Sequence, residues 1–208
     1  MEPRYQLRTT SQYGMTLAFG ALALVILVLQ LVQVGTNGLF FTVVFCLGIC
    51  LIAVALWLLP CLEVNASGVI IANSFTTTTI PYSDLLAVES RWGMKLTTKA
   101  GRSYSVRSFG TSASSRGQNR RPSPSKKPGE AAAYVPGARI PVLSSGTMRL
   151  RTTTYAASAL IEDLWEEYRP RKKVAMQAAT QRYWAWDRIA ILALGAACMV
   201  VSTNALFN

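Results

Sequence analysis

TTSQYGMTLAFGALALVILVLQLVQVGTNGLFFTVVFCLGICLIAVALWLLPCL, residues 9–62, is a run of 54 residues without a charged side chain. A helix that crosses a bilayer needs roughly 20 apolar residues, so this run is long enough for two crossings. GTNG at 35–38 is a turn signal near its middle. We therefore expect a transmembrane helical hairpin over 13–60, with helices at 13–34 and 39–59, after an N-terminal arm at 1–12.

Two other interpretations of this run are weaker. The apolar core of the first segment is too long for a signal peptide, and a second apolar segment follows it within five residues. A buried hairpin in a soluble protein would need a large apolar domain around it, and the rest of the chain is too polar to supply one. In lipid each segment must satisfy its own backbone hydrogen bonds, which leaves helix as the expected structure.

A third apolar segment lies near the C-terminus. Residues 189–207 read IAILALGAACMVVSTNALF and carry no charge. The residues before them, YWAWDR at 183–188, combine aromatic and charged side chains, as is typical of the headgroup level of a membrane. We expect a third transmembrane helix over 188–207, joined to the preceding domain by a juxtamembrane linker at 170–187.

The distribution of basic residues predicts the orientation. The net charge is +11, and the 91–152 segment holds thirteen Lys or Arg and one acid, Glu130. The N-terminal arm has Arg4 and Arg8, and the hairpin turn has no charge. Because positive loops stay inside, we expect the N-terminus and the middle segment in the cytoplasm and the C-terminus outside the plasma membrane.

The composition excludes several kinds of chemistry. The chain has no histidine, so Ser-His-Asp and Cys-His catalysis and His-ligated metal sites are excluded. Cys46, Cys50, Cys61 and Cys198 show no disulfide or metal spacing, although a juxtamembrane cysteine such as Cys61 is open to acylation. We expect no catalytic residue, no metal and no cofactor, and we predict that the protein is not an enzyme.

The middle segment, 61–169, reads as a cytoplasmic β domain with a capping helix. Strands are expected around 62–64, 69–72, 76–80 and 84–89, followed by a hairpin of 94–98 and 102–107 around Lys99-Ala100-Gly101. The pattern of 138–143 favours a last strand. Leu160, Ile161, Leu164 and Trp165 form one apolar stripe of a helix over 153–168, with a Thr152–Thr154 N-cap and an end at Pro170.

The domain contains a basic loop at 111–137, rich in Ser, Pro and Gly and predicted to be disordered. Its charges serve either to hold the segment inside or to contact anionic lipid headgroups or a protein partner. Ser123 and Ser125, next to proline and basic residues, are candidate phosphorylation sites. Specific nucleic-acid binding is not expected, because the tract lacks interleaved aromatics. The candidate contact residues of the loop are Arg116, Arg120, Arg121, Lys126 and Lys127. Those of the predicted linker at 170–187 are Arg171, Lys172 and Lys173.

Three short motifs carry a resemblance to a known family. They are SGVIIAN at 67–73, IPYSDLLAV at 80–88 and LTTKAGRSYSV at 96–106. This pattern, behind two apolar segments, resembles the bacterial PH domains of small actinobacterial membrane proteins of the low-molecular-weight antigen type. The resemblance covers about 15–110 and 150–168. Tyr82 stands where that family usually has Trp, and Ala100 where it usually has Asp.

The resemblance implies an α+β membrane protein. Its parts would be a transmembrane hairpin, a PH-like sheet or barrel domain with a C-terminal capping helix, and a last transmembrane helix. Such domains are non-catalytic interaction or scaffold modules, and the phosphoinositide binding of eukaryotic relatives is not carried over. The alternative is an accessory subunit of a larger membrane complex, respiratory or transport, in which small residues allow self-association or packing on a membrane protein. Among them are Gly14, Gly20, Gly48 and Gly195.

Overall fold

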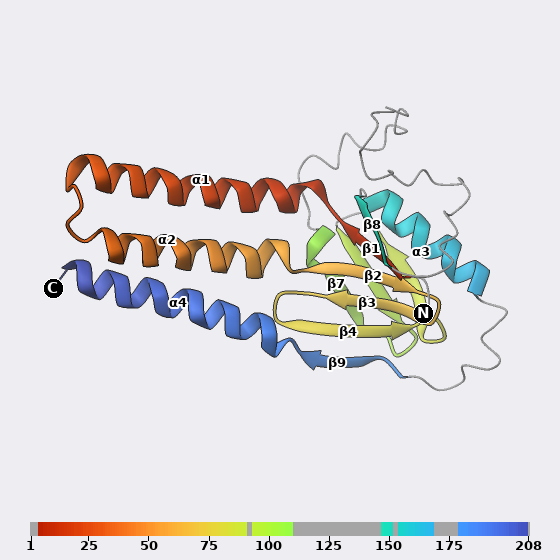
Figure 1. Ribbon diagram of the computed structural model, residues 1–208. Coiled ribbons are helices and arrows are strands. Elements are labelled where there is room, and N and C mark those ends of the chain that lie inside the picture. Colours follow the sequence, from red (N-terminus) through yellow and green to blue (C-terminus); the bar gives the residue numbers. More distant parts are fainter. Residues whose placement is uncertain (1–3, 91–92, 110–146, 152–153, 169–178, 208) are drawn as a thin grey trace, which may run out of the picture. The chain divides into compact units, whose positions relative to one another are not determined.

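The computed structural model describes residues 4–90, 93–109, 147–151, 154–168 and 179–207 (Figure 1). The chain divides into two compact units. The β unit consists of Met1–Thr10 and Cys61–Tyr183, and the helical unit consists of Ser11–Pro60 and Trp184–Asn208. Each unit is therefore built from segments that are far apart in the sequence.

The helical unit contains α1 (Thr10–Gln33), α2 (Leu39–Ala53), the π-helical turn η1 (Val54–Leu58) and α4 (Trp186–Phe207). Three stretches are long and apolar enough to cross a membrane, judged by length and composition: Ser11–Gln33, Leu39–Leu58 and Trp186–Ala205. The expectation of three such helices is thus confirmed. Gly35 and Gly38 have φ of 76° and 72°, a region that glycine enters without steric cost, and they form the reversal between α1 and α2.

The helices of this unit contact each other through small and aromatic residues. Gly48 of α2 lies against Gly195 of α4, and Ser202 of α4 is fully buried. The Cys46 thiol donates to the Ala23 carbonyl across α1 and α2 (3.2 Å). The rings of Phe19 and Trp57 stack with centroids 4.9 Å apart. At the base of the hairpin, the Gln12 amide donates to the Pro60 carbonyl at 2.9 Å and is buried.

The larger sheet of the β unit has six strands, in the order β8-β1-β2-β3-β4-β9 (Figure 1). β1 pairs antiparallel with β2, with Leu7 opposite Leu62, and parallel with β8, with Leu7 opposite Leu150. The strands are β1 (Arg4–Arg8), β2 (Cys61–Asn65), β3 (Gly68–Ala72), β4 (Thr76–Pro81), β8 (Thr147–Arg151) and β9 (Gln181–Trp184).

The smaller sheet has the order β5-β6-β7 and is antiparallel. Its strands are β5 (Leu85–Glu89), β6 (Met94–Thr98) and β7 (Ser103–Val106), and the 3-10 turn η2 (Arg107–Phe109) follows β7. The predicted hairpin around residues 99–101 is confirmed, and Gly101 has the positive φ (74°) that its turn requires. Asn73 links the two sheets, because its amide donates to the Ser105 carbonyl and its Oδ1 accepts from the Arg107 amide, both at 2.9 Å.

One apolar core joins both sheets to helix α3 (Thr154–Tyr168). Alternate residues of β1 and β2 face this core, which is the period of a half-buried strand. The predicted stripe of α3 is confirmed through Leu160, Ile161 and Leu164, all buried. The largest fully buried side chains come from β1 to β6, η2 and α3, and include Leu7, Leu62, Ile71, Ile80, Leu96, Phe109 and Leu160.

Two boundaries differ from the sequence analysis. Residues 4–8 of the predicted cytoplasmic arm are strand β1, because Tyr5 and Leu7 alternate with polar residues and fill the core. The predicted linker at 170–187 contains β9, an edge strand, and the first residues of α4, which begins at Trp186. The basic loop at 111–137, the predicted strand at 138–143, Thr152 and Pro170 lie outside the described residues.

Candidate functional site

The contact residues predicted from sequence lie outside the part of the chain that the structure describes. These are Arg116, Arg120, Arg121, Lys126, Lys127, Arg171, Lys172 and Lys173, together with the serines Ser123 and Ser125. The lipid or partner contact and the phosphorylation therefore stay predictions. Within the described residues, three polar features of the β unit are candidates for function.

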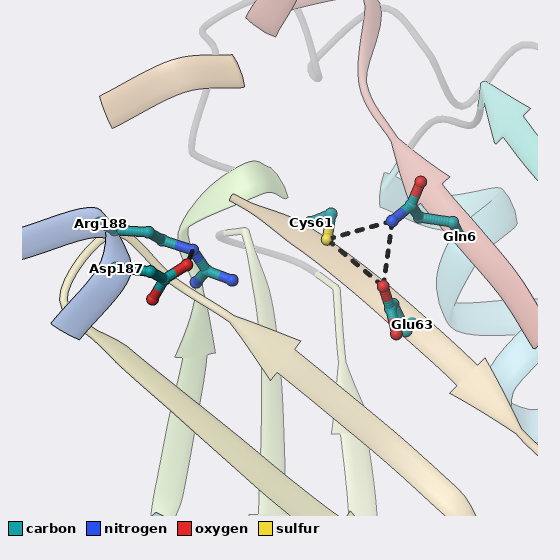
Figure 2. Close-up of polar contacts among 5 residues, drawn as sticks. All are labelled: Gln6, Cys61, Glu63, Asp187 and Arg188. Carbon is teal, nitrogen blue, oxygen red and sulfur yellow. Dashed lines mark hydrogen bonds and ion pairs between the residues drawn. The ribbon is translucent and has the colours of Figure 1, made fainter. Parts of the chain in front are cut away.

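The first is a side-chain cluster of β1 and β2 (Figure 2), whose Gln6 and Glu63 alternate along the strands with the buried residues of the core. The Gln6 amide donates to Glu63 Oε1 at 3.0 Å and approaches Cys61 Sγ at 3.7 Å. The Cys61 thiol lies 3.9 Å from the same Glu63 oxygen. Only 5% of Cys61 is exposed, and a thiol that donates to a carboxylate is not activated as a nucleophile. The cluster thus links β1 to β2 through polar side-chain contacts.

Figure 2 also shows the start of α4, where Asp187 and Arg188 form an ion pair. Arg188 Nε lies 3.8 Å from Asp187 Oδ2, and the Asp187 side chain is 73% exposed. A pair at this distance with an exposed carboxylate contributes little to stability. The pair lies in the first turn of α4 and marks the polar end of this apolar helix.

The second candidate is an open cleft of about 500 Å³ at the turns that join β4 to β5 and β6 to β7. The Thr180 hydroxyl donates to Asp84 Oδ2, and the Asp84 carbonyl accepts from the Lys99 amide at 2.8 Å. The Asp84 amide also donates to the Pro81 carbonyl, which fits its predicted role in a turn. The polar lining of the cleft includes Ser83, Asp84, Thr98, Arg102, Tyr104 and Thr180.

The cleft combines an acidic, a basic and an aromatic side chain in a shallow polar surface. Arg102 is exposed, Asp84 is half-buried and held by Thr180, and Tyr104 is half-buried. Such a surface has both hydrogen-bond donors and hydrogen-bond acceptors, but it has no nucleophile beside a base. It suits recognition of a polar partner segment better than bond cleavage.

The third candidate, which we call the basic end, consists of Arg8, Arg107 and Arg151. Arg8 and Arg151 are the last residues of the parallel neighbours β1 and β8, and they stand opposite each other in register. The Thr9 hydroxyl, next to Arg8, donates to the Ser108 carbonyl, next to Arg107, at 2.9 Å. Arg107 is exposed. Three basic residues from three distant parts of the sequence are thereby gathered at one end of the β unit.

Sequence reasoning did not find the basic end, although part of its signal was present. RYQLR at 4–8 alternates polar and apolar residues, which is the pattern of a half-buried strand. Its pairing with Arg151 is not visible in any local pattern. Among the described residues, no group of three or more Cys, Asp or Glu side chains is arranged to hold a metal ion.

Comparison of the chain with protein-family models, with curated proteins and with solved structures finds no match. The functional interpretation therefore rests on the residues and the geometry described above.

Proposed function

We propose that this protein is a membrane-anchored, non-catalytic interaction module, with a PH-like domain at the cytoplasmic face of a bacterial plasma membrane. The observation that carries the proposal is the pairing of β1 with β2 across the apolar run. Leu7 and Leu62 are register partners, and α1, α2 and η1 lie between them in the sequence. An apolar insertion between two neighbouring strands must leave and return on one side of a membrane, as a hairpin of two crossings does.

The PH-like interpretation is supported by the order of the elements. Four strands, β1 to β4, belong to one sheet, the next three form a second sheet, and the capping helix α3 follows. The motifs at 67–73, 80–88 and 96–106 fall on β3, on the β4–β5 corner and on the β6–β7 hairpin. The residues that resemble bacterial PH domains thus stand at strand and corner positions of a domain built from two sheets and a helix.

Charge and parity together support the proposed orientation. The basic residues concentrate in the β unit and its loops, which favours the cytoplasm. Strand β9 is a neighbour of β4 and leads directly into α4, so the third crossing starts from the same side. The C-terminus is then outside. Cysteine substitution at exposed Ser103 tests this: a membrane-impermeant maleimide should label it only after the cells are opened, and labelling of intact cells would contradict the orientation.

The partner-binding surface is assigned to the cleft beside the β6–β7 turn. A photo-crosslinking amino acid at Ala100, an exposed residue of the cleft lining, is expected to capture a discrete protein in intact membranes. The matched control places the same group at exposed Glu167 of α3. Capture at position 100 alone supports an interaction module. Equal capture at both positions, or none at position 100, would contradict the assignment.

The second candidate function is an accessory subunit of a larger membrane complex. The observation in its favour is the open space beside Gly14 and Gly20 of α1, where an added Cβ atom would meet no other atom within 4 Å, whereas Gly48 and Gly195 are packed. Two open glycines on one span allow close approach of another helix. Purification of the full chain in mild detergent should then yield a complex that Gly14→Leu and Gly20→Leu disrupt. Recovery as a lone monomer would count against this function.

A further inference from the structure

The basic end contains a polar group that the described residues leave unsatisfied. Arg8 Nε is buried, and no described residue accepts a hydrogen bond from it. Arg151 stands opposite Arg8 in register, so two basic residues occupy adjacent strand ends. A buried donor without an acceptor costs free energy. An oxyanion bound by the Arg8 guanidinium group would offset that cost.

Two carboxylates of the β unit, those of Glu63 and Glu89, have neighbours of their own. The Glu63 carboxylate accepts from the Gln6 amide at 3.0 Å. Glu89, at the end of β5, stands opposite Lys95 in the β5–β6 register. Each of these two acids thus has a polar or basic neighbour of its own.

The position of the basic end in the chain favours a lipid as the source of that anion. Arg8 stands three residues before Ser11, where the first candidate membrane span begins. Three residues reach at most about 11 Å, so Arg8 cannot be far from the headgroups if that span crosses. Phe75 supports the same conclusion, because it is 43% exposed in the Asn73–Thr76 turn, whose Asn73 accepts from the Arg107 amide.

We propose that Arg8 and Arg107, beside the strand end that carries Arg151, bind the phosphate groups of anionic phospholipids. The guanidinium group suits this role because its donors match the geometry of phosphate oxygens. Phe75 enters the apolar edge of the same headgroup layer. The proposal rests on the membrane location in the proposed function, but it needs no protein partner, so the two can fail separately.

The test uses the full chain reconstituted with equal amounts of phosphatidylcholine and phosphatidylglycerol, then released into mild detergent for native mass spectrometry. The measured quantity is the ratio of anionic to neutral lipid that stays bound. A basic residue near the surface is worth enough to enrich anionic lipid about fivefold. Arg107→Gln should therefore lower the ratio by about that factor, and Arg8→Gln with Arg107→Gln should lower it further.

The control is Lys99→Gln, which removes one exposed positive charge at the opposite end of β7, in the β6–β7 turn. This variant should keep the wild-type ratio. Arg107 is exposed, so its variant should fold even if the Arg8 change does not. An unchanged ratio in Arg107→Gln would overturn the proposal. So would displacement of the bound anionic lipid by millimolar inorganic phosphate, because it would assign the site to a soluble anion.

Discussion

Gly48 and Gly195 face each other so closely that a Cβ atom on Gly48 would lie 2.7 Å from the Gly195 carbonyl oxygen. The same atom would lie 2.8 Å from Met199 Cγ. Side chains essentially never approach backbone this closely, so the pair fixes the distance between α2 and α4. Association of apolar helices depends on such close packing, since lipid and helix surfaces are equally apolar.

Substitution of Gly48 by alanine is therefore expected to separate α2 from α4. The cost should be about 1–3 kcal/mol, the usual penalty for an overpacked contact. Thermal unfolding of the full chain in detergent measures it. Gly20→Ala is the matched control, because a Cβ at Gly20 meets no atom within 4 Å. Helix propensity alone favours alanine over glycine at both positions. Equal destabilisation by both variants would therefore contradict a specific role of the Gly48–Gly195 contact.

Replacement of Gln12 by leucine is expected to weaken the base of the helical hairpin. The Gln12 amide is buried and donates to the Pro60 carbonyl at 2.9 Å. Loss of the donor leaves a carbonyl without this partner, at a cost of about 1–3 kcal/mol. Gln30→Leu provides the comparison, because Gln30 donates to the Asn37 carbonyl at an exposed position at the other end of α1. A larger effect at Gln30 than at Gln12 would contradict the prediction.

The N-terminal strand is expected to be essential for the stability of the β unit. Leu7 of β1 is fully buried between Leu62 and Leu150 in the sheet register. Leu7→Ala should lower the free energy of unfolding by about 2–5 kcal/mol, as is usual for a cavity in a core. Arg4→Ala, at an exposed position of the same strand, should have little effect. Denaturant unfolding monitored by near-UV circular dichroism distinguishes the two.

Replacement of Glu162 in α3 by glutamine is expected to increase stability in a pH-dependent way. Partial burial, and then the negative charges of Asp163 and Glu166, raise the pKa of its carboxyl. The ionised form is therefore disfavoured in the folded state. This penalty is fully present above the raised pKa of the folded state. It disappears as the pH falls through that pKa and then below the pKa of the unfolded state. Glu162→Gln should stabilise at pH 7 by about 0.2–0.5 kcal/mol, the size of one like-charge pair on a helix.

The measurement for Glu162→Gln is the melting temperature of variant and wild type between pH 7 and pH 3. The difference should shrink toward zero in acid. Glu167→Gln removes the same charge from an exposed position of α3 and separates this effect from that of net charge. A difference that grows as the pH falls would have the wrong sign for a raised pKa.

Local patterns were sufficient for most of the fold. The absence of charge over residues 9–62 predicted α1 and α2, and alternation or β-branched runs predicted β2 to β7. The stripe through Leu160 and Leu164 predicted α3. In each case the residues that determine the element lie within one short window, so periodicity alone reveals it.

The elements that were not predicted depend on distant partners. β1 is a short strand that directly precedes an apolar helix, and its identity depends on β2 and β8. β9 has four exposed residues and thus shows no alternation of burial. The basic end could not be predicted for the same reason, because Arg8 and Arg151 meet only through the parallel β1–β8 pairing. The predicted basic loop lies outside the described residues and stays a prediction.

Strand β1 precedes both of its sheet neighbours, β2 and β8, in the sequence, and the two apolar helices lie between β1 and β2. Because a chain is made from its N-terminal side, Leu7 meets its register partner Leu62 only after α1, α2 and η1 have been made. Leu150 of β8, the other register partner of Leu7, is made later still. The core of the β unit can therefore be completed only after the whole apolar run between β1 and β2 has been made.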